Sequence, residues 1–504
     1  MCGIAGLWGG GDSDLVEAMK QAPVHRGPDA EGTYADRHGV LGHRRLSIMD
    51  PQGGNQPIAC EDGRLTIVGN GEIYNFPRLR PELEASHTFA TRSDTESALH
   101  LYQDIGTAAA SKLDGMFALA IADGDKLFLA RDPIGIKPLY MGRRGTSTVF
   151  ASELKALAGH AEDVEEFPAG SFYHTDTGFQ TYYSVPDVPV QKRSLDEHLQ
   201  IVRKTLEQCV VKRLMSDVEV GAFLSGGLDS SLIAAIMKQH LDRMHTFSVG
   251  IEGSRDLEAA RLVSKHIGSI HHEYAFTADE ILEHLPEILY HLESFDRDLV
   301  RSAIPCFFVS RLAAEHLKVI HTGEGADELF AGYTYYKDID DEQVLHDELR
   351  RSVMSLHNIN LQRVDRLTMA HSLEARVPFL DTDMIAVAQT IPARLKQFDP
   401  TTGKRVEKWI LRKACEDLLP DEIVWRDKEQ FDEGSGTVDI VDRLLAEQMP
   451  PEQAADYRKQ HPDAVLRSDE ECLYHRILAE QFDNSPVVLG NVAHWSMRPD
   501  HINN

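Results

Sequence analysis

The sequence of 504 residues contains no apolar run near the roughly 20 residues that span a bilayer. Its first residues, Met1 to Gly11, show no basic segment followed by an apolar stretch, so no signal peptide is expected. Basic charge is scarce: 52 Lys and Arg face 80 Asp and Glu, which gives a net charge of -28. Because nucleic-acid binding needs basic patches, nucleic acid is not an expected partner. We expect a cytoplasmic protein that binds neither membranes nor nucleic acids.

Cysteine is scarce too. Six cysteines occur, none in a C-x-x-C pair or at the spacing of zinc ligands. In a cytoplasmic chain they should be reduced, and most should be small buried core residues, with Cys2 the exception because of its position. The Walker A pattern G-x-x-x-x-G-K-[ST] is also absent, which removes the main support for a kinase or a GTPase.

The first half of the sequence contains short β patterns at Leu65–Val68, Met116–Ile121 and Lys126–Ala130, separated by turns rich in Gly and Asp. A helical pattern interrupts them at Ser93–Ile105. Together these patterns predict an α+β domain in which sheets pack together with helices outside.

The pattern changes at residues 185–193, where two prolines cannot continue a helix or a central strand. The chain is too long for one ordinary core, so we predict a domain at 2–184, a linker at 185–193 and a domain at 194–504. In the second domain strand and helix patterns alternate, which predicts an α/β parallel sheet followed by a mainly helical part. The predicted elements are strands at Val218–Leu224, His245–Ile251 and Val319–His321, and helices at Ser194–Arg213, Ser230–Leu241 and Leu257–Ile267.

A Ser-Gly-Gly-Leu-Asp-Ser-Ser loop lies at Ser225–Ser231, between a predicted strand and a predicted helix. Its glycines, Gly226 and Gly227, let backbone N–H groups approach an anion, and the helix N-terminus adds donors and a favourable dipole. Asp229 would repel a bare phosphate, so it is expected as a Mg²⁺ ligand. A glycine-rich turn with capping side chains is the alternative, which the strand–loop–helix setting disfavours. The loop resembles the pyrophosphate-binding loop of N-type ATP pyrophosphatases, and the resemblance implies ATP.

A second acidic loop, Thr322–Glu328, follows a later predicted strand. Strand ends in open α/β sheets face the ligand crevice, so Asp327 is expected to share Mg²⁺ with Asp229. A helix N-terminus rich in acids is the alternative. Because this loop accompanies the phosphate loop, we favour a Mg²⁺ site over a helix N-terminus that is merely rich in acids.

The cysteine at position 2 acquires a free α-amine if Met1 is removed. That amine titrates near ~8, so it can accept the thiol proton of Cys2. The thiolate could then attack a carboxamide, forming a thioester and releasing ammonia. An incidental cysteine near a terminus is the alternative, and neighbouring segments argue against it.

Four segments resemble, in this order, those of class II glutamine amidotransferases, which have an Ntn-type fold. They are Arg26-Gly27-Pro28-Asp29, Arg45-Leu46-Ser47-Ile48, Asn70-Gly71-Glu72-Ile73-Tyr74-Asn75 and Ser93-Asp94-Thr95-Glu96. The resemblance implies that Arg45 binds the glutamine α-carboxylate and that Asp94 and Glu72 bind its α-amine. Asn70 and the backbone of Gly71 would form the oxyanion hole, with the donors that a tetrahedral oxyanion needs.

Both halves together resemble glutamine-hydrolysing asparagine synthetases of the B type. The family implies that the aspartate carboxylate attacks the α-phosphate of ATP-Mg²⁺, giving β-aspartyl-AMP and pyrophosphate, and that ammonia from Cys2 travels through a tunnel to displace AMP. Glu324 would act as a base toward ammonia or contact the intermediate, and Lys428 would neutralise charge on the α-phosphate. The residues expected to bind ATP are Leu224, Ser225, Gly226, Gly227, Asp229, Ser230, Val249, Thr322 and Gly323.

The sequence departs from the family near the acceptor pocket. Asp298 and Leu299 stand where well-known bacterial members carry two threonines, and Thr322 stands where a serine is usual. Arg301 and Glu328 are the expected acceptor-binding residues. Another amide-forming ligase on this scaffold therefore remains an alternative. The sequence does not decide whether the chain forms a homodimer. A non-catalytic protein is disfavoured because Cys2, Asp229 and Lys428, whose loss would mark one, are all present.

Overall fold

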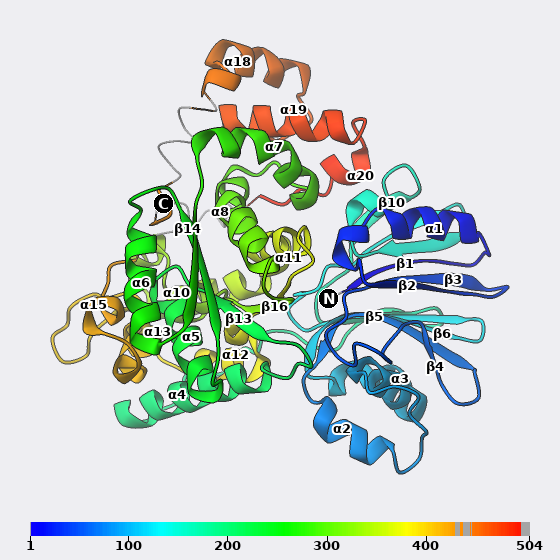
Figure 1. Ribbon diagram of the computed structural model, residues 1–504, viewed down its shortest axis with the longest axis horizontal. Helices are drawn as coiled ribbons and strands as arrows, with labels where there is room; N and C mark the ends of the chain where they lie inside the picture. The colour runs from blue at the N-terminus through cyan, green and yellow to red at the C-terminus, as the bar shows by residue number, and fades with distance from the viewer. Residues whose placement is uncertain (1, 429–433, 437–443, 445, 495–504) are drawn as a thin grey trace.

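The computed structural model of the protein describes residues 2–428, 434–436, 444 and 446–494; Met1, whose removal would free the α-amine of Cys2, lies outside them. Three sheets organise these residues (Figure 1): two antiparallel sheets in the first half, then one parallel sheet. The strands of the first half are β1 (Cys2–Trp8), β2 (Ala30–Ala35), β3 (Gly39–Arg45), β4 (Ile58–Ala59), β5 (Leu65–Ile73), β6 (Gly115–Asp123), β7 (Lys126–Arg131), β8 (Tyr140–Arg144), β9 (Ser147–Ala151), β10 (Glu162–Glu166), β11 (Ser171–His174) and β12 (Gly178–Thr181).

The two antiparallel sheets have strand orders β10-β8-β9-β1-β3-β2 and β12-β11-β7-β6-β5-β4. They pack face to face over a core to which Ile4 and Leu41 contribute from one sheet and Val68 and Leu127 from the other. Helix α1 (Ser13–Gln21) covers the first sheet, and α2 (Phe76–Leu83) and α3 (Asp94–Ile105) cover the second (Figure 1). This four-layer arrangement confirms the predicted α+β fold of the first half.

The second half begins with α4 (Leu195–Lys212), which is capped by Ser194, and contains a five-stranded sheet of order β15-β14-β13-β16-β17. All its strand pairs are parallel, which confirms the predicted α/β class. The strands are β13 (Val220–Phe223), β14 (His245–Gly250), β15 (Ile270–Ala275), β16 (Val319–His321) and β17 (Glu374–Arg376). The two edge strands were not predicted, because β15 is largely polar and β17 has only 3 residues.

Helices cover both faces of the parallel sheet. One core cluster joins α4, α5 (Leu228–His240) and α6 (Arg255–Ile267) to one face, and another joins α7 (Ala278–Leu292) and α8 (Arg297–Ala314) to the other. The remaining helices confirm the mainly helical C-terminal part: α9 (Ala326–Phe330), α10 (Glu342–Met354), α11 (Asn360–Met369), α12 (Thr382–Gln389), α13 (Ala393–Gln397), α14 (Trp409–Ala414), α15 (Asp421–Val424), α18 (Pro451–Gln460), α19 (Asp469–Gln481) and α20 (Pro486–Leu489). No helix among the described residues combines the length and apolar character that a membrane span requires.

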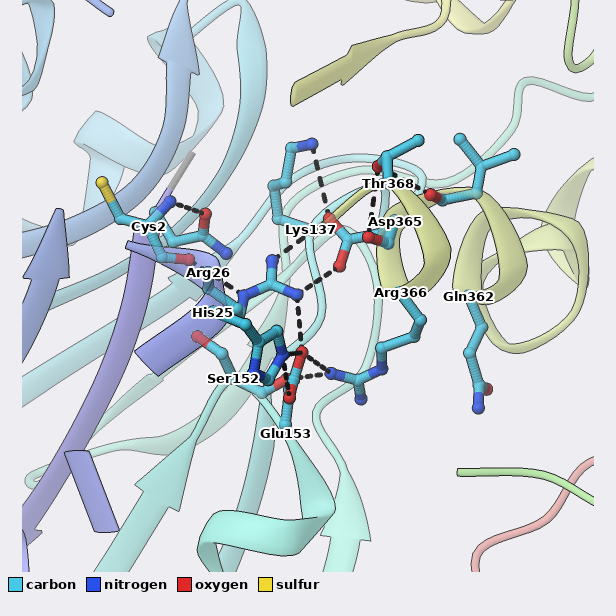
Figure 2. Close-up of polar contacts among 12 residues, drawn as sticks. Cys2, His25, Arg26, Lys137, Ser152, Glu153, Gln362, Asp365, Arg366 and Thr368 are labelled. Carbon is cyan, nitrogen blue, oxygen red and sulfur yellow. Dashed lines mark hydrogen bonds and ion pairs between the residues drawn. The ribbon is translucent and has the colours of Figure 1, made fainter. Parts of the chain in front are cut away.

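A buried ion-pair network joins the two halves (Figure 2). Arg26, from the first half, donates to Glu153 at 2.9 Å and to Asp365 of α11 at 2.7 Å. Arg366, also on α11, pairs with Glu153 at 3.0 Å. Removing one member of a buried pair leaves an uncompensated charge, typically at a cost of about 3–5 kcal/mol. The network therefore fixes the register of the two halves close to Cys2.

Candidate active sites

Cys2 is the first residue of β1 and lies opposite Arg45, the last residue of β3. Its side chain is buried. Its backbone N–H donates to Asn70 Oδ1 at 3.0 Å, and its carbonyl accepts from Arg26 Nε at 3.0 Å. Burial raises the pKa of the Cys2 thiol, while the amino-terminal charge and Arg45 act in the opposite direction. The thiol therefore needs a nearby base, since its environment does not ionise it.

An unused donor lies next to this cysteine. Asn70 is fully buried, and its Nδ2 has no hydrogen-bond partner among the described residues. Gly71 follows it with φ +143°, and a Cβ there would lie 1.9 Å from the carbonyl oxygen of Met116. Only glycine fits this position. The strand thus presents an unsatisfied amide donor beside the sulfur-bearing residue, as an oxyanion hole requires.

The residues expected to hold glutamine surround the same place. The Arg45 guanidinium donates to the carbonyls of Met49, Asp50 and Pro51 and to Asn55 Oδ1, at 2.6–3.1 Å. These contacts fix its position at the end of β3.

Two buried acids lie close to one another. Asp94 Oδ2 accepts from the backbone N–H of Ile73 at 2.6 Å, and Glu72 Oε2 lies 3.7 Å from Arg376 Nη2 of β17. Burial raises the pKa of Asp94 to about 6, and burial together with Glu374 and Asp94 raises the pKa of Glu72 well above its usual value. Such a pair of carboxyl groups is stabilised by an arriving ammonium.

A cavity of about 530 Å³ opens at the carboxyl ends of β13, β14 and β16. Most of the residues expected at the second site line it: Leu224, Ser225, Gly227, Asp229, Ser230, Val249, Thr322, Gly323, Glu324, Asp327 and Lys428. Gly226, Arg301 and Glu328 are not among its lining residues.

The loop after β13 is held by its own hydroxyl groups. Ser230 Oγ accepts from the backbone N–H of Ser225 at 3.2 Å, and Ser225 Oγ accepts from the N–H of Gly227 at 3.3 Å. Gly226 has φ +73°, and a Cβ there would lie 2.4 Å from Ala259 Cβ, so glycine is required. Gly227 is the N-cap of α5 and carries no side-chain cap. The first turn of this helix therefore offers N–H donors to an anion.

Two lysines compensate the acids of this cavity. Lys428 Nζ donates to Asp327 Oδ2 at 2.8 Å, and Lys408 Nζ pairs with Asp327 Oδ1 at 2.6 Å and also with Asp229. Burial would raise the pKa of Asp327, but the two lysines outweigh burial and lower it. The same acids raise the pKa of Lys428 against the effect of burial. Lys408, which the sequence analysis missed, carries no local motif.

Within the cavity, the carboxyl groups of Asp229 and Asp327 are suited to hold a metal ion. Lys408 contacts both of them, so they lie close together. Asp229 Oδ1 is buried and has no hydrogen-bond partner among the described residues. An unsatisfied carboxylate oxygen in a cavity of this kind fits a hard cation such as Mg²⁺.

The two residues that were expected to bind the acceptor, Arg301 and Glu328, do not line the cavity. Arg301 Nε donates to Glu470 of α19 at 3.0 Å, so its guanidinium turns away from the cavity. Glu328 accepts from Tyr333 Oη at 2.6 Å, and burial raises its pKa to about 8. In place of Arg301, the wall of the cavity carries residues 297–299.

Within that wall, Asp298 accepts from the side chain of Arg297 at 3.0–3.1 Å, and this pairing balances the charge of the acid that departs from the family. Glu324 and Arg363, which also line the cavity, pair with each other, and burial raises the pKa of Glu324. Each of these two arginines is thus paired with an acid, so the two pairs present both signs of charge to the cavity.

The chain matches two family models, the glutamine amidotransferase domain over residues 1–187 and asparagine synthase over 201–342 and 337–484. It is 40% identical over 460 residues to asparagine synthetase (glutamine-hydrolyzing) 2 of Oryza sativa subsp. japonica, covering 86% of this chain and 78% of the relative. It is 38% identical over 460 residues to asparagine synthetase (glutamine-hydrolyzing) 1 of Arabidopsis thaliana, with the same coverage of 86% and 78%. With the enzyme of Zea mays it shares 37% identity over 507 residues, covering 95% of this chain and 86% of the relative.

Proposed function

This chain belongs to the family of glutamine-hydrolysing asparagine synthetases, and on that premise we propose that it converts aspartate to asparagine with ATP and with ammonia taken from glutamine. One observation carries the proposal: a buried cysteine beside an unsatisfied amide donor shares a chain with a cavity of about 530 Å³ that contains a phosphate-type loop and two lysines. The first arrangement suits ammonia release, and the second suits the activation of a carboxylate.

The glutaminase reaction uses Cys2 once Met1 is removed. Its α-amine accepts the thiol proton, and the thiolate attacks the side-chain carbonyl of glutamine. Asn70 Nδ2 and the backbone N–H of Gly71 donate to the oxyanion. The C–N bond then breaks, the amine returns its proton to the leaving nitrogen, and ammonia departs. Water hydrolyses the thioester, releasing glutamate and the free thiol.

Glutamine is held at both ends of its backbone. Arg45 binds the α-carboxylate as a planar donor whose orientation the carbonyls of residues 49–51 already fix. Asp94 and Glu72 bind the α-ammonium, whose positive charge opposes the rise in the pKa values of both buried carboxyl groups. Recognition of the backbone charges leaves the side chain directed toward Cys2.

The synthetase reaction takes place in the cavity. The phosphates of ATP lie against the Ser225–Ser231 loop and the first turn of α5, and the aspartate carboxylate attacks the α-phosphate to give β-aspartyl-AMP and pyrophosphate. Lys428 neutralises charge that develops on the α-phosphate. Glu324, whose pKa burial raises, takes a proton from ammonia as it displaces AMP.

Asp229 and Asp327 would hold Mg²⁺, which would neutralise part of the charge of the bound phosphates. Asp229→Asn tests this role, because it keeps the shape of the residue and removes its charge. We expect loss of pyrophosphate release at all Mg²⁺ concentrations, with normal glutamine hydrolysis. Normal ATP turnover in this variant would show that Asp229 does not bind the metal ion.

The proposal that aspartate is the acceptor has to account for Asp298 and Leu299, which stand where well-known bacterial family members carry two threonines. Asp298 and Leu299 both line the cavity, and the Arg297–Asp298 pair presents both signs of charge, which suits the zwitterionic end of an amino acid. The alternative is an amidotransferase of the same scaffold that uses another carboxylic acid.

Pyrophosphate release and amide formation across aspartate, glutamate and other carboxylic acids distinguish the two, with mass spectrometry of the products. We expect aspartate to give the highest kcat/KM. A far higher kcat/KM for another carboxylic acid would show that asparagine synthesis is the wrong assignment, although the chain would still be an amidotransferase.

Three further expectations remain predictions: the domain limits at 2–184 and 194–504, a cytoplasmic location and a homodimer. Light scattering after size-exclusion chromatography measures the last of these directly.

A further inference from the structure

Three histidines gather at the end of the parallel sheet opposite the cavity. His245 is the first residue of β14, His272 lies in the neighbouring strand β15, and His316 lies in the segment between α8 and β16. We call them the histidine triad. The phosphate loop follows the carboxyl ends of the strands, whereas the triad lies near their amino ends, so it takes no part in the chemistry proposed above.

The ligating nitrogens of the triad all lie within 4.8 Å of one another. His245 Nδ1 and His272 Nε2 face each other at 2.8 Å. Two nitrogens bound to one ion at about 2.0–2.1 Å lie about 2.8–3.4 Å apart at octahedral to tetrahedral angles, so these two need to separate by at most about 0.6 Å. The ring of His316 lies against that of His272 at 4.0 Å between centroids, tilted by 32°, and the His316 side chain is exposed.

No carboxylate of the described residues forms an ion pair with the triad within 4.0 Å. Other histidine groups of this chain differ: His87, for example, lies 2.8 Å from Asp104 and 3.4 Å from Glu61. His245 is also buried, and its Nε2 has no hydrogen-bond partner among the described residues. A set of imidazoles without an acid partner is suited to a cation that binds neutral nitrogen.

We propose that the histidine triad binds one first-row transition-metal ion of the kind that prefers imidazole, such as Zn²⁺, Ni²⁺ or Cu²⁺. Three protein ligands leave a coordination position open to water at the exposed side of His316. The bound ion would tie β14 and β15 to the segment that leads into β16. Since Phe247, which lines the cavity, stacks on His272 at 5.0 Å, the ion would also stabilise the sheet beneath the nucleotide.

Co²⁺ titration of the full-length protein, with Mg²⁺ in excess to occupy carboxylate sites, tests this site. Four-coordinate Co²⁺ with nitrogen ligands gives visible absorption bands that hexa-aqua Co²⁺ does not. We expect these bands in the unaltered protein and at least ~10-fold weaker Co²⁺ affinity in His272→Gln and His316→Gln, since even outer ligand partners contribute about 10–100-fold. Zn²⁺ should raise the Tm of the unaltered protein more than that of either variant.

Two control variants remove histidines elsewhere. His240→Gln alters an exposed histidine, and His87→Gln alters the separate group with Glu61 and His100. Both should keep the Co²⁺ bands. Glutamine-dependent asparagine formation without added transition metal checks that each variant is folded. Absence of the bands in the unaltered protein, or unchanged bands in both triad variants, would show that the triad is an aromatic stack only.

Discussion

The two proposed active sites of this chain solve opposite electrostatic problems. The site at Cys2 is closed, and its polar groups are set before substrate arrives: Asn70 has an unused donor, and Glu72 and Asp94 have raised pKa values. The second half contains an open cavity of about 530 Å³, and its acids are already paired with Lys408 and Lys428. The first site is suited to glutamine, a small zwitterion. The second site is suited to ATP, a polyanion whose negative charges have to be balanced.

The comparison teaches how one chain separates two reactions. A closed site protects a thioester from competing nucleophiles, and its precise donors stabilise one oxyanion. An open site lined by lysines admits ATP and discharges pyrophosphate. Substitutions on each side should therefore affect one half-reaction and leave the other unchanged.

The largest expected effect on the open side comes from Lys428. We expect Lys428→Ala to lower the rate of adenylation by at least ~100-fold, since a positioned charge acts mainly on the transition state. Pyrophosphate release with ammonium as nitrogen donor measures it, and Lys413→Ala, which removes a half-exposed lysine paired with Glu416, is the control. A raised KM for ATP with normal kcat would assign Lys428 to ground-state binding instead.

On the closed side, Asn70→Ala should lower kcat for glutamine hydrolysis by about 100-fold, the scale of losing one oxyanion donor. Ammonium-dependent asparagine formation in the same variant is the internal control and should be unchanged. If both activities fell together, Asn70 would have a structural role at the junction of the two halves.

A smaller effect sharpens the comparison at the acceptor. Asp298→Thr releases Arg297 from its partner and should change KM for aspartate by a few-fold, on the scale of about 1 kcal/mol for an exposed charge pair. Steady-state kinetics with saturating ATP measures the change, and KM for glutamine should stay constant. An unaltered KM for aspartate would place the Arg297–Asp298 pair outside acceptor recognition.

The smallest effect on activity, with a clear one on stability, concerns Lys396 of α13. It is fully buried, its Nζ has no hydrogen-bond partner among the described residues, and burial lowers its pKa to about 7. Lys396→Met should therefore raise the free energy of unfolding by about 1–3 kcal/mol near pH 7, with both activities retained.

The pH dependence of this gain has a definite sign. The unfolded lysine titrates near ~10.4, so between pH 7 and 10 the unfolded state binds the additional proton, and the stability of the unaltered protein rises with pH. The advantage of Lys396→Met should be full below pH 7 and shrink toward pH 10. Denaturant unfolding at pH 6.5 and 9 measures it, with the exposed Lys404→Met as control; an equal gain at both pH values would mean that Lys396 stays charged in the fold.

The sequence predicted β13, β14, β16, α5 and α6 around the cavity because hydrophobic periodicity marks them directly. At the Cys2 site it predicted α3 and the first part of β5, but neither β1 nor β3. Glycine loops or a family motif mark Asp229, Asp327 and Lys428, which all line the cavity, and their roles remain predictions. Lys408 was missed since its role depends on tertiary packing alone.

Arg301 illustrates the limit of motif matching. On α8, Arg297, Asp298, Leu299 and Ser302 line the cavity, but Arg301 does not. Glu470 of α19 holds the Arg301 side chain instead. A contact made by a helix some 170 residues later in the sequence cannot be read from the local pattern.

The central claim, that two separate sites share ammonia, is tested most directly by paired assays of Cys2→Ala. Asparagine formation is measured with glutamine and with ammonium as alternative nitrogen donors, after intact mass has established whether Met1 is absent from the unaltered protein. We expect glutamine-dependent formation and glutamine hydrolysis to fall by at least ~1,000-fold, while ammonium-dependent formation continues and increases with pH as more NH₃ becomes available. A Cys2→Ala protein that still used glutamine at the normal rate would contradict the two-site account.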